Sequence, residues 1–297
     1  MKKRVAAIVV TYNRKQLLME NIASLLSQTM HDTMDIIIID NASTDGTKDA
    51  LGKYITSKQI IYINTGSNLG GAGGFQYGIK YAAKHHYDYI WVMDDDCMPT
   101  PNALEALIGT DWQLGSNYGF LSSKVLWKNK EICTMNVQRR TVFKNVNDFS
   151  TPIVPVSMAS FVSLFIPTRV VLDVGLPIKE FFIWTDDWEY TRRISRKYKC
   201  YLVNKSIVIH KSKSNIGANI SNDSPDRLDR YNYLYRNDVY LYRREGIQGF
   251  LYELVRLSWH TAKVVMNAND YKMERLRKIW KGTLNGLSFH PKIEKVK

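Results

Sequence analysis

The sequence has few cysteines and no long uninterrupted apolar run, and these absences narrow the class of protein. Its 3 cysteines, Cys97, Cys133 and Cys200, lie far apart and form no Cys-x-x-Cys pair. This spacing excludes a zinc ribbon and is typical of a protein from the reducing cytosol. No run of about 18 apolar residues is present, so we expect no transmembrane helix. The segment Met1–Arg4 leads into a short apolar stretch, so we also expect no signal peptide.

Negative charge is scarce relative to positive charge. The chain of 297 residues carries 41 Lys and Arg against 28 Asp and Glu, which gives a formal net charge of +13. Such a surface favours an anionic partner, and nucleic acid, anionic lipid or a phosphorylated substrate would each satisfy it. A hydrophobic content of 45% with 12% aromatic residues indicates a folded chain rather than a disordered one. The length allows one large α/β domain, alone or with a helical appendage.

The most informative stretch is an apolar run that ends in three carboxylates. Tyr89–Met93 is typical of a buried strand, and Asp94, Asp95 and Asp96 follow it directly. Open α/β sheets bind ligands at the carboxyl ends of their strands. Alternation along an extended chain predicts that Asp94 and Asp96 point to one side and Asp95 to the other. That pattern suits Mg²⁺ or Mn²⁺, although a solvated acidic turn before Pro99 is the alternative.

Three earlier apolar segments predict further strands, each followed by a loop and a helical pattern. They are Val5–Val10, Asp35–Asp40 and Gln59–Asn64. Strands that alternate with helices favour a parallel sheet. The loop Asn68–Gly74 contains four glycines but neither a dinucleotide fingerprint nor a P-loop. These glycines either let the backbone approach a phosphate or sugar, or make a tight turn between strand and helix.

A second acidic cluster and a histidine follow in the part of the chain beyond Pro101. The sequence Thr185–Ile194 predicts the start of a helix with Asp186 and Asp187 in its first turn. Lys199–Ile209 alternates as a last strand would, and His210 stands at its end. We therefore expect His210 at a strand terminus, as we do for the three aspartates.

The last quarter of the chain is strongly basic. Residues 227–297 hold 15 Lys or Arg against 7 Asp or Glu. Helical spacing of apolar residues over Leu228–Tyr242 and Ile247–Val255 predicts two amphipathic, aromatic-rich helices. These helices either bind an anionic membrane surface or cap the preceding domain with their basic residues in water.

Five short segments in a fixed order carry a resemblance to a known family. They are Val9–Arg14, Asp40–Thr47, Asn68–Phe75, Trp91–Asp96 and Trp184–Glu189. Together they resemble the inverting glycosyltransferases of family 2, which have the GT-A fold. The glycine-rich segment with the Asp-Asp-Asp run is more narrowly similar to the bacterial galactofuranosyltransferase branch. The resemblance covers roughly residues 5–212, and the C-terminal helices lie outside it.

This resemblance implies an α/β fold with a Rossmann-like, mostly parallel central sheet flanked by helices, and a C-terminal helical extension. The GT-A domain is expected at residues 1–220, with a nucleotide-binding half at about 1–100 and an acceptor half at about 101–220. Residues 221–297 would then form the basic amphipathic extension.

The resemblance also assigns residues to a nucleotide-sugar donor. It gives Thr11, Asp40 and Asp45 to the base and ribose, with Asp40 accepting from a uracil or thymine imide N–H. The other residues expected at the donor are Tyr12, Asn13, Arg14, Asn41, Asn68, Gly70, Gly71, Gly73, Asp94 and Asp95.

Metal and acceptor residues follow in the same way. Asp94 and Asp96 match the family's Asp-x-Asp motif, and His210 matches the late histidine that completes a Mn²⁺ or Mg²⁺ site in the galactofuranosyltransferase branch. Asp187 matches the general base. The residues expected to bind the acceptor are Trp184, Asp186 and Glu189. Asp186 is the competing candidate for the base. The helix dipole lowers the pKa of both carboxylates and their mutual repulsion raises it, so the sequence leaves the choice between them open.

The implied function is metal-dependent, inverting transfer of a sugar, with galactofuranose expected, from a UDP- or dTDP-linked donor. The acceptor would be a glycan or a polyprenyl-diphosphate-linked glycan of a bacterial capsule or cell wall, at the cytoplasmic face of the membrane. No nucleic-acid partner is expected, and the oligomeric state stays open. Alternatives are a rhamnosyl- or other hexosyltransferase, a nucleotidyltransferase, or a non-catalytic protein that binds polyanions or membranes.

Overall fold

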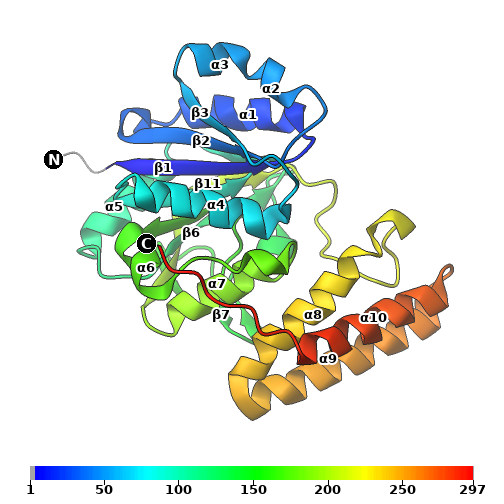
Figure 1. Cartoon of the computed structure of the whole chain (residues 1–297). Coiled ribbons are helices and arrows are strands. Elements are labelled where there is room, and N and C mark those ends of the chain that lie inside the picture. The colour runs from blue at the N-terminus through cyan, green and yellow to red at the C-terminus, as the bar shows by residue number, and fades with distance from the viewer. Residues whose placement is uncertain (1–3, 297) are drawn as a thin grey trace.

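A mixed sheet of nine strands organises the α/β part of the computed structural model, which describes residues 4–296 (Figure 1). The strand order is β3-β2-β1-β4-β10-β6-β11-β5, and β9 pairs with β11 beside this path. The strands are β1 (Val5–Thr11), β2 (Met34–Asp40), β3 (Ile60–Asn64), β4 (Tyr89–Asp94), β5 (Cys97–Pro99), β6 (Leu121–Trp127), β9 (Ile153–Val156), β10 (Leu164–Pro167) and β11 (Cys200–His210). A separate hairpin joins β7 (Arg139–Thr141) to β8 (Lys144–Asn145).

The first four strands in the chain are parallel, as their apolar sequences predicted. β1 lies between β2 and β4, and β3 pairs with β2. The second half of the sheet is mixed, because β10 runs antiparallel to both β4 and β6, while β11 runs parallel to β6. Residues 110–155 had no clear period, and β7, β8 and β9, which lie in or at the end of this part, are short and separated by turns and loops.

Helices cover both faces of the sheet and bury its apolar side chains in two clusters. Ile8, Ile39 and Ile79 belong to one cluster, and Val9, Ile38 and Leu18 belong to the other. The division follows the alternation of side chains along each strand. The helices of this part are α1 (Lys15–Leu26), α2 (Thr47–Ala50), α3 (Gly52–Thr56), α4 (Gly70–Lys84), α5 (Ala103–Gln113), α6 (Thr168–Val174) and α7 (Asp186–Ser195).

Strand register brings the polar ends of several strands to one edge. Thr11 pairs with Asp40 across β1 and β2, and Val10 pairs with Asp94 across β1 and β4. On the other half of the sheet, His210 at the end of β11 pairs with Cys97 of β5, directly after the aspartate run. The predicted convergence of Asp94–Asp96 and His210 at strand ends is therefore built into the sheet.

The C-terminal part contains a helix that the sequence pattern missed. The structure has α8 (Arg230–Tyr242), α9 (Gly246–Asn267) and α10 (Lys272–Leu287), where two helices were expected. Figure 1 shows α9 and α10 side by side, extending away from the sheet. Their own small core contains Ile220, Leu228, Tyr231, Tyr235, Leu257, Val264, Ala268 and Ile279. Within residues 4–296 the structure has no helix that is both long and apolar enough to span a bilayer.

The segment after α10 returns to the α/β domain instead of continuing the helical extension. Figure 1 shows residues 288–296 running beside α6. The Leu176 N–H donates to the Glu294 carbonyl at 2.8 Å, and Lys80 Nζ pairs with Glu294 Oε1 at 2.5 Å. The expected extension at 221–297 is therefore helical only in part, and its last residues pack on the first domain.

Candidate active site

Two loops at the edge of the sheet hold each other through side-chain hydrogen bonds. The Asn13 N–H donates to Ser43 Oγ at 2.9 Å, and the Thr44 N–H donates to Asn13 Oδ1 at 2.7 Å. Asp45 accepts from the Lys15 N–H at 3.0 Å and from the Thr47 N–H at 3.1 Å, so it contacts the first residues of α1 and α2. Burial raises its pKa, but hydrogen bonds from Thr47 and Lys15 more than offset this and lower the pKa of Asp45.

Asp40 lies fully buried beside these loops. Its Oδ2 accepts from the Tyr62 hydroxyl at 2.6 Å, and its Oδ1 accepts from the Ser43 N–H at 2.8 Å. Burial and this hydrogen bond raise the pKa of Tyr62 to about 12. A nucleobase could reach Asp40 only by sharing one of these two oxygens. Tyr62, which sits on the neighbouring strand, carried no signal of this partnership in the sequence.

The glycine-rich segment makes a tight turn at Gly70. Gly70 has a φ of +70°, and a Cβ there would lie 2.2 Å from the Phe182 carbonyl oxygen. The Asn41 side-chain amide donates to the Gly70 carbonyl at 2.9 Å, and the Gly70 N–H donates to Asn68 Oδ1 at 2.9 Å. At Gly71 a Cβ would meet nothing within 4 Å. The tight turn therefore explains Gly70, and open space adjoins Gly71.

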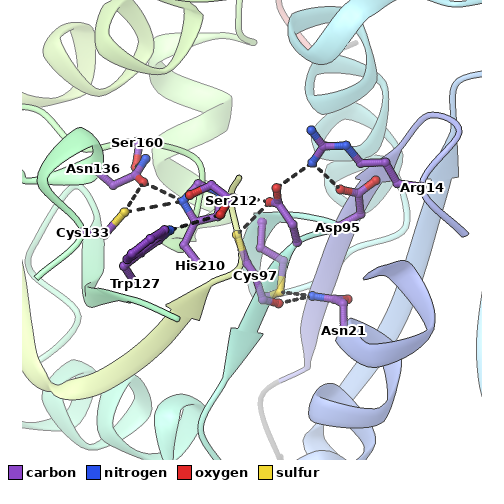
Figure 2. A network of polar contacts seen from close by, with 12 residues as sticks. Arg14, Asn21, Asp95, Cys97, Trp127, Cys133, Asn136, Ser160, His210 and Ser212 are labelled. Atoms are coloured by element: carbon purple, nitrogen blue, oxygen red, sulfur yellow. Dashed lines mark hydrogen bonds and ion pairs between the residues drawn. The ribbon is translucent and has the colours of Figure 1, made fainter. Parts of the chain in front are cut away.

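The aspartate run departs from the extended geometry that the sequence predicted. β4 ends at Asp94, and Asp95 and Asp96 form a turn before β5, so the alternation of sides does not continue through Asp96. Instead, Arg14 Nη1 contacts both acids, at 3.3 Å from Asp95 Oδ1 and 2.5 Å from Asp96 Oδ2 (Figure 2). Thr11 Oγ1 donates to Asp95 Oδ2 at 2.8 Å.

Burial dominates the titration of this cluster. Burial raises the pKa of Asp95 to about 7, although Arg14 acts in the opposite direction. Burial and the charge on Asp96 raise the pKa of Asp94 to about 6. For Asp96, burial is outweighed by His210 and Arg14, so its pKa is lowered and it stays ionised.

His210 completes the cluster. Its Nε2 lies 3.1 Å from Asp96 Oδ1, and both side chains are almost fully buried. One potential ligand atom from each of Asp96, Cys97 and His210 lies within 4.8 Å of the other two. Burial and the neighbouring carboxylates Asp96 and Asp94 raise the pKa of the Cys97 thiol well above its usual value, so this thiol stays protonated.

The donor set fits a divalent cation. A carboxylate oxygen of Asp96 and an imidazole nitrogen of His210 are ligands that Mn²⁺ accepts, and the ionised Asp96 supplies charge. Asp94 influences Asp96 electrostatically but is not in the compact three-residue group. Its role as a metal ligand therefore stays a prediction.

A strained turn precedes the second acidic cluster. Phe182, Trp184 and Thr185 have φ of 63°, 64° and 68°, which is unusual for residues other than glycine. The buried Asn237 of α8 donates its side-chain amide to three carbonyls of this turn, including that of Trp184 at 2.9 Å. Thr185 Oγ1 donates to Asp238 Oδ1 at 2.7 Å. Strain of this kind persists where the surroundings enforce it, as α8 does here.

Asp187 lies in the first turn of α7. Its Oδ1 accepts from the Trp188 N–H at 2.7 Å. Burial raises the pKa of Asp187 to about 7, with a further contribution from Asp94, while Arg139 acts to lower it. Burial, Asp187 and Asp94 raise the pKa of Asp186 well above its usual value. Asp94 thus raises the pKa of both residues, and a single site that joins the two acidic clusters stays a prediction.

Comparison with known proteins identifies a family for the first part of the chain. Residues 6–111 match the family model Glycosyl transferase family 2. This part of the chain is therefore a family 2 glycosyltransferase domain.

Two curated relatives extend the match. Over 280 residues the transferase is 24% identical to Galactofuranosyltransferase GlfT1 of Mycolicibacterium smegmatis, covering 86% of this chain and 89% of that protein. Over 99 residues it is 35% identical to the protein of the same name from Mycobacterium tuberculosis, covering 32% of this chain and 31% of that protein. The predicted likeness to galactofuranosyltransferases is thereby confirmed.

Solved structures confirm the GT-A fold. The crystal structure of S. aureus TarS 1–349 aligns with a TM-score of 0.55 at 14% identity, covering 96% of this chain and 72% of that chain. The crystal structure of GalNAc-T7 with UDP, GalNAc and Mn2+ aligns with a TM-score of 0.65 at 13% identity, covering 93% and 54% respectively.

Two residues expected at the acceptor have structural partners in this transferase. Glu189 is buried, and both of its carboxylate oxygens accept from Arg193, at 3.0 and 2.8 Å. It is an intrahelical ion pair, so the structure does not support contact between Glu189 and an acceptor. Trp184 packs against Tyr231 of α8, with ring centroids 5.1 Å apart. Trp184 remains partly exposed and thus available to a substrate.

Sequence reasoning missed the residues of α8 that hold the Asp187 turn. Asn237 and Asp238 lie within the predicted helix, between the apolar positions Tyr235 and Val239. A buried Asn-Asp pair on a helix face needs hydrogen-bond partners. That requirement is the signal that could have marked the two residues, but it does not name the turn that they contact.

We expect Gly70→Ala to destabilise the transferase and Gly71→Ala to leave its stability nearly unchanged. The first substitution forces alanine into a left-handed conformation and against the Phe182 carbonyl, whereas the second adds a methyl group to open space. The loss for Gly70→Ala should be roughly 2 kcal/mol or more in the free energy of unfolding, measured in urea. Equal stability of the two variants would contradict the close approach of α4 to the Phe182 turn.

Proposed function

We propose that this transferase moves galactofuranose from a UDP- or dTDP-linked donor to a glycan or polyprenyl-diphosphate-linked acceptor in bacterial cell-surface polysaccharide synthesis. One observation supports the proposal: Asp96 and His210 meet at strand ends beside Asp94, whose charge raises the pKa of Asp187. Galactofuranosyltransferase GlfT1, a relative along most of the chain, supports the choice of sugar.

The donor diphosphate would lie against the aspartate run. Asp96 and His210, with Asp94, would hold Mn²⁺ or Mg²⁺ there, as their donor atoms allow. Such a cation acts as a Lewis acid that stabilises negative charge on the departing diphosphate. The Arg14 side chain forms ion pairs with Asp95 and Asp96. When a donor binds, Arg14 can instead form hydrogen bonds with its phosphate oxygens.

Asp187 would act as the general base in a single displacement. Its carboxylate takes the proton from the acceptor hydroxyl while that oxygen bonds to the anomeric carbon and the nucleoside diphosphate leaves with the bonding electrons. The anomeric configuration therefore inverts. A pKa of about 7 is suited to a base that works near neutral pH.

Asp186 takes a different role in this proposal. Burial and the charge on Asp187 raise the pKa of Asp186 well above its usual value, and in this proposal Asp186 keeps its proton. A protonated carboxyl donates a hydrogen bond and cannot accept a proton as a base. We therefore assign acceptor binding to Asp186 and the role of base to Asp187.

Other donors and another class of function are the alternatives. Poly-beta-1,6-N-acetyl-D-glucosamine synthase of Staphylococcus aureus is 26% identical over 96 residues, covering 32% of this chain and 22% of that protein, so a different hexosyl donor is the second candidate. A non-catalytic polyanion- or membrane-binding protein would have no need of several buried carboxylates with raised pKa, which cost stability.

The proposal predicts release of a nucleoside diphosphate when the purified protein is given its donor and an acceptor glycan. A panel of UDP- and dTDP-linked sugars, with galactofuranose included, should yield one preferred donor whose turnover stops in excess chelator. Release of pyrophosphate would indicate a nucleotidyltransferase instead. No turnover with any donor, together with retained binding of polyanions, would favour the non-catalytic alternative.

Replacement of Asp187 by Asn should lower turnover about 10²-fold or more while the KM for the donor stays nearly constant. The change keeps the shape of the side chain and removes its basicity. In the wild type, kcat/KM should rise as the pH increases through about 7, because Asp187 must lose its proton to act as a base. Steady-state kinetics of both proteins from roughly pH 5 to 9, about two units on each side of that pKa, would test the loss of turnover and the pH dependence.

A suitable control is Asp32→Asn, which alters a carboxylate with 71% of its side chain exposed. This variant should keep wild-type turnover. A product with retained anomeric configuration, or an Asp187→Asn variant with wild-type turnover, would contradict the mechanism.

We also propose peripheral association with an anionic membrane surface through α9 and α10. None of the exposed residues of α9 is charged, and most are large and apolar. They include Ile247, Phe250, Leu251, Leu254, Val255, Trp259, Val265 and Met266. The adjacent α10 exposes Lys272, Arg277 and Lys281 together with Trp280. Apolar side chains flanked by cations are typical of helices that lie in the interface of anionic bilayers.

Exchange of one exposed tryptophan tests this surface. Trp259→Ser should weaken co-sedimentation with anionic vesicles about tenfold, ~1.4 kcal/mol, because a large apolar side chain no longer leaves water. Trp112→Ser alters a tryptophan of α5 that is 68% exposed, and it should have no effect. Binding of the wild type should fall at high salt. Absence of binding at low salt would show that α9 and α10 only cap the fold.

A further inference from the structure

His210 is held from both sides of its ring. Nε2 lies 3.1 Å from Asp96 Oδ1, and Nδ1 lies 2.7 Å from the side-chain oxygen of Asn136. Figure 2 shows Asn136 on the side of the ring away from the aspartate run. Both His210 and Asn136 are buried, with exposures of 6% and 7%. The orientation of the ring therefore depends on protein contacts and not on solvent.

The orientation of the Asn136 amide is itself fixed. Its Nδ2 donates to Ser160 Oγ at 3.2 Å, and its Oδ1 accepts from the Cys133 thiol at 3.2 Å. With the nitrogen turned toward Ser160, the amide oxygen faces His210. Because an amide oxygen only accepts hydrogen bonds, Nδ1 of His210 carries a hydrogen. Nε2 donates a second hydrogen to the Asp96 carboxylate, and a cation bound there would take the place of that hydrogen.

The segment that carries Asn136 is anchored on both sides of the site. The Cys133 N–H donates to the Val125 carbonyl of β6 at 2.9 Å, and the Thr134 N–H donates to Asn215 Oδ1 at 2.7 Å. The first bond ties the segment to the strand beside β11, and the second ties it to the chain that follows His210. Asn136 can thus hold the ring against a rigid support.

We propose that Asn136 is a positioning residue for the metal site, holding His210 with Nε2 toward the cation and Nδ1–H toward its own amide oxygen. This inference rests on the proposed function in one respect, because it takes His210 and Asp96 as ligands of the metal ion. It adds a residue outside the sequence motifs, in a part of the chain that showed no pattern. Partners of this kind typically change metal affinity 10- to 100-fold when they are removed.

Two substitutions at Asn136 separate positioning from simple packing. Asn136→Leu keeps a similar volume but removes the acceptor, whereas Asn136→Asp keeps an oxygen toward Nδ1, and Ser160 can donate its hydroxyl hydrogen to the new carboxylate. Gln138→Leu is the matched control, because Gln138 is also buried and donates to a backbone carbonyl, that of Ser123, at 2.8 Å.

The measurement is Mn²⁺ affinity, obtained from the electron paramagnetic resonance signal of free Mn²⁺ in titrations of each full-length protein. Asn136→Leu should bind Mn²⁺ about 10- to 100-fold more weakly than the wild type. The Mn²⁺ affinities of Asn136→Asp and Gln138→Leu should stay within about threefold of the wild-type value. Asn136→Asp retains an acceptor for Nδ1 of His210, and Gln138→Leu leaves the contact between Asn136 and His210 intact. Thermal unfolding of every variant reports whether the fold is kept.

Wild-type affinity in a folded Asn136→Leu variant would overturn the proposal while leaving the proposed function intact. Absence of Mn²⁺ binding by the wild type would overturn both the proposal and the metal-dependent step of the proposed function. If Asn136→Leu does not fold, Ser160→Ala takes its place, because loss of this acceptor lets the Asn136 amide turn over. Ser160→Ala should then weaken Mn²⁺ binding several-fold, and an unchanged affinity would count against the proposal.

Discussion

Burial of several carboxylates at one edge of the sheet is the constraint on which the rest of the site depends. Burial is the largest cause of the raised pKa values of Asp94, Asp95, Asp186 and Asp187. Carboxylates that are taken out of water cost free energy unless cations or donors compensate them. The structure gives Asp95 and Asp96 the guanidinium of Arg14. No comparable ion pair reaches Asp94 or Asp187 among the described residues 4–296.

The C-terminal helices support this site in addition to forming the proposed membrane-binding surface. Asn237 and Asp238 of α8 hold the turn that leads to Asp187, and Arg256 of α9 pairs with Asp238 at 2.9 Å. Arg256 also pairs with the buried Glu253 at 2.8 Å. A chain of contacts therefore runs from α9, whose outer face is apolar, to the turn that leads to Asp187, the proposed base. The extension that the sequence presented as a separate unit is a structural support of the active site.

Much of this arrangement was predictable from the sequence because it rests on local patterns. The apolar runs that end in Thr11, Asp40 and Asp94 determine both the strands and the edge at which these residues meet. The unpredicted parts depend on contacts between distant segments. The turn at Asp95 and Asp96 replaces extended geometry because Arg14 bridges both acids, and no strand period encodes that bridge.

The difference between sequence patterns and packing contacts also explains two wrong predictions, one on α7 and one in the C-terminal part. Glu189 lies in an acidic motif and was therefore expected at the acceptor, yet Arg193, one helical turn later, takes both of its oxygens. The i,i+4 spacing of this pair was visible in the sequence and was the better guide. α10 was missed because its exposed Met273 and Trp280 blur the apolar period, and only packing on α8 shows its buried face.

The account depends most directly on whether the buried carboxylates hold a divalent cation together with the donor diphosphate. Calorimetric titration of UDP into the purified protein, with Mn²⁺ and then with excess chelator, measures this without any knowledge of the acceptor. The account predicts that Mn²⁺ strengthens UDP binding at least about tenfold, ~1.4 kcal/mol, and that Asp96→Asn abolishes the gain. Equal UDP affinity with and without Mn²⁺ in the wild type would contradict it.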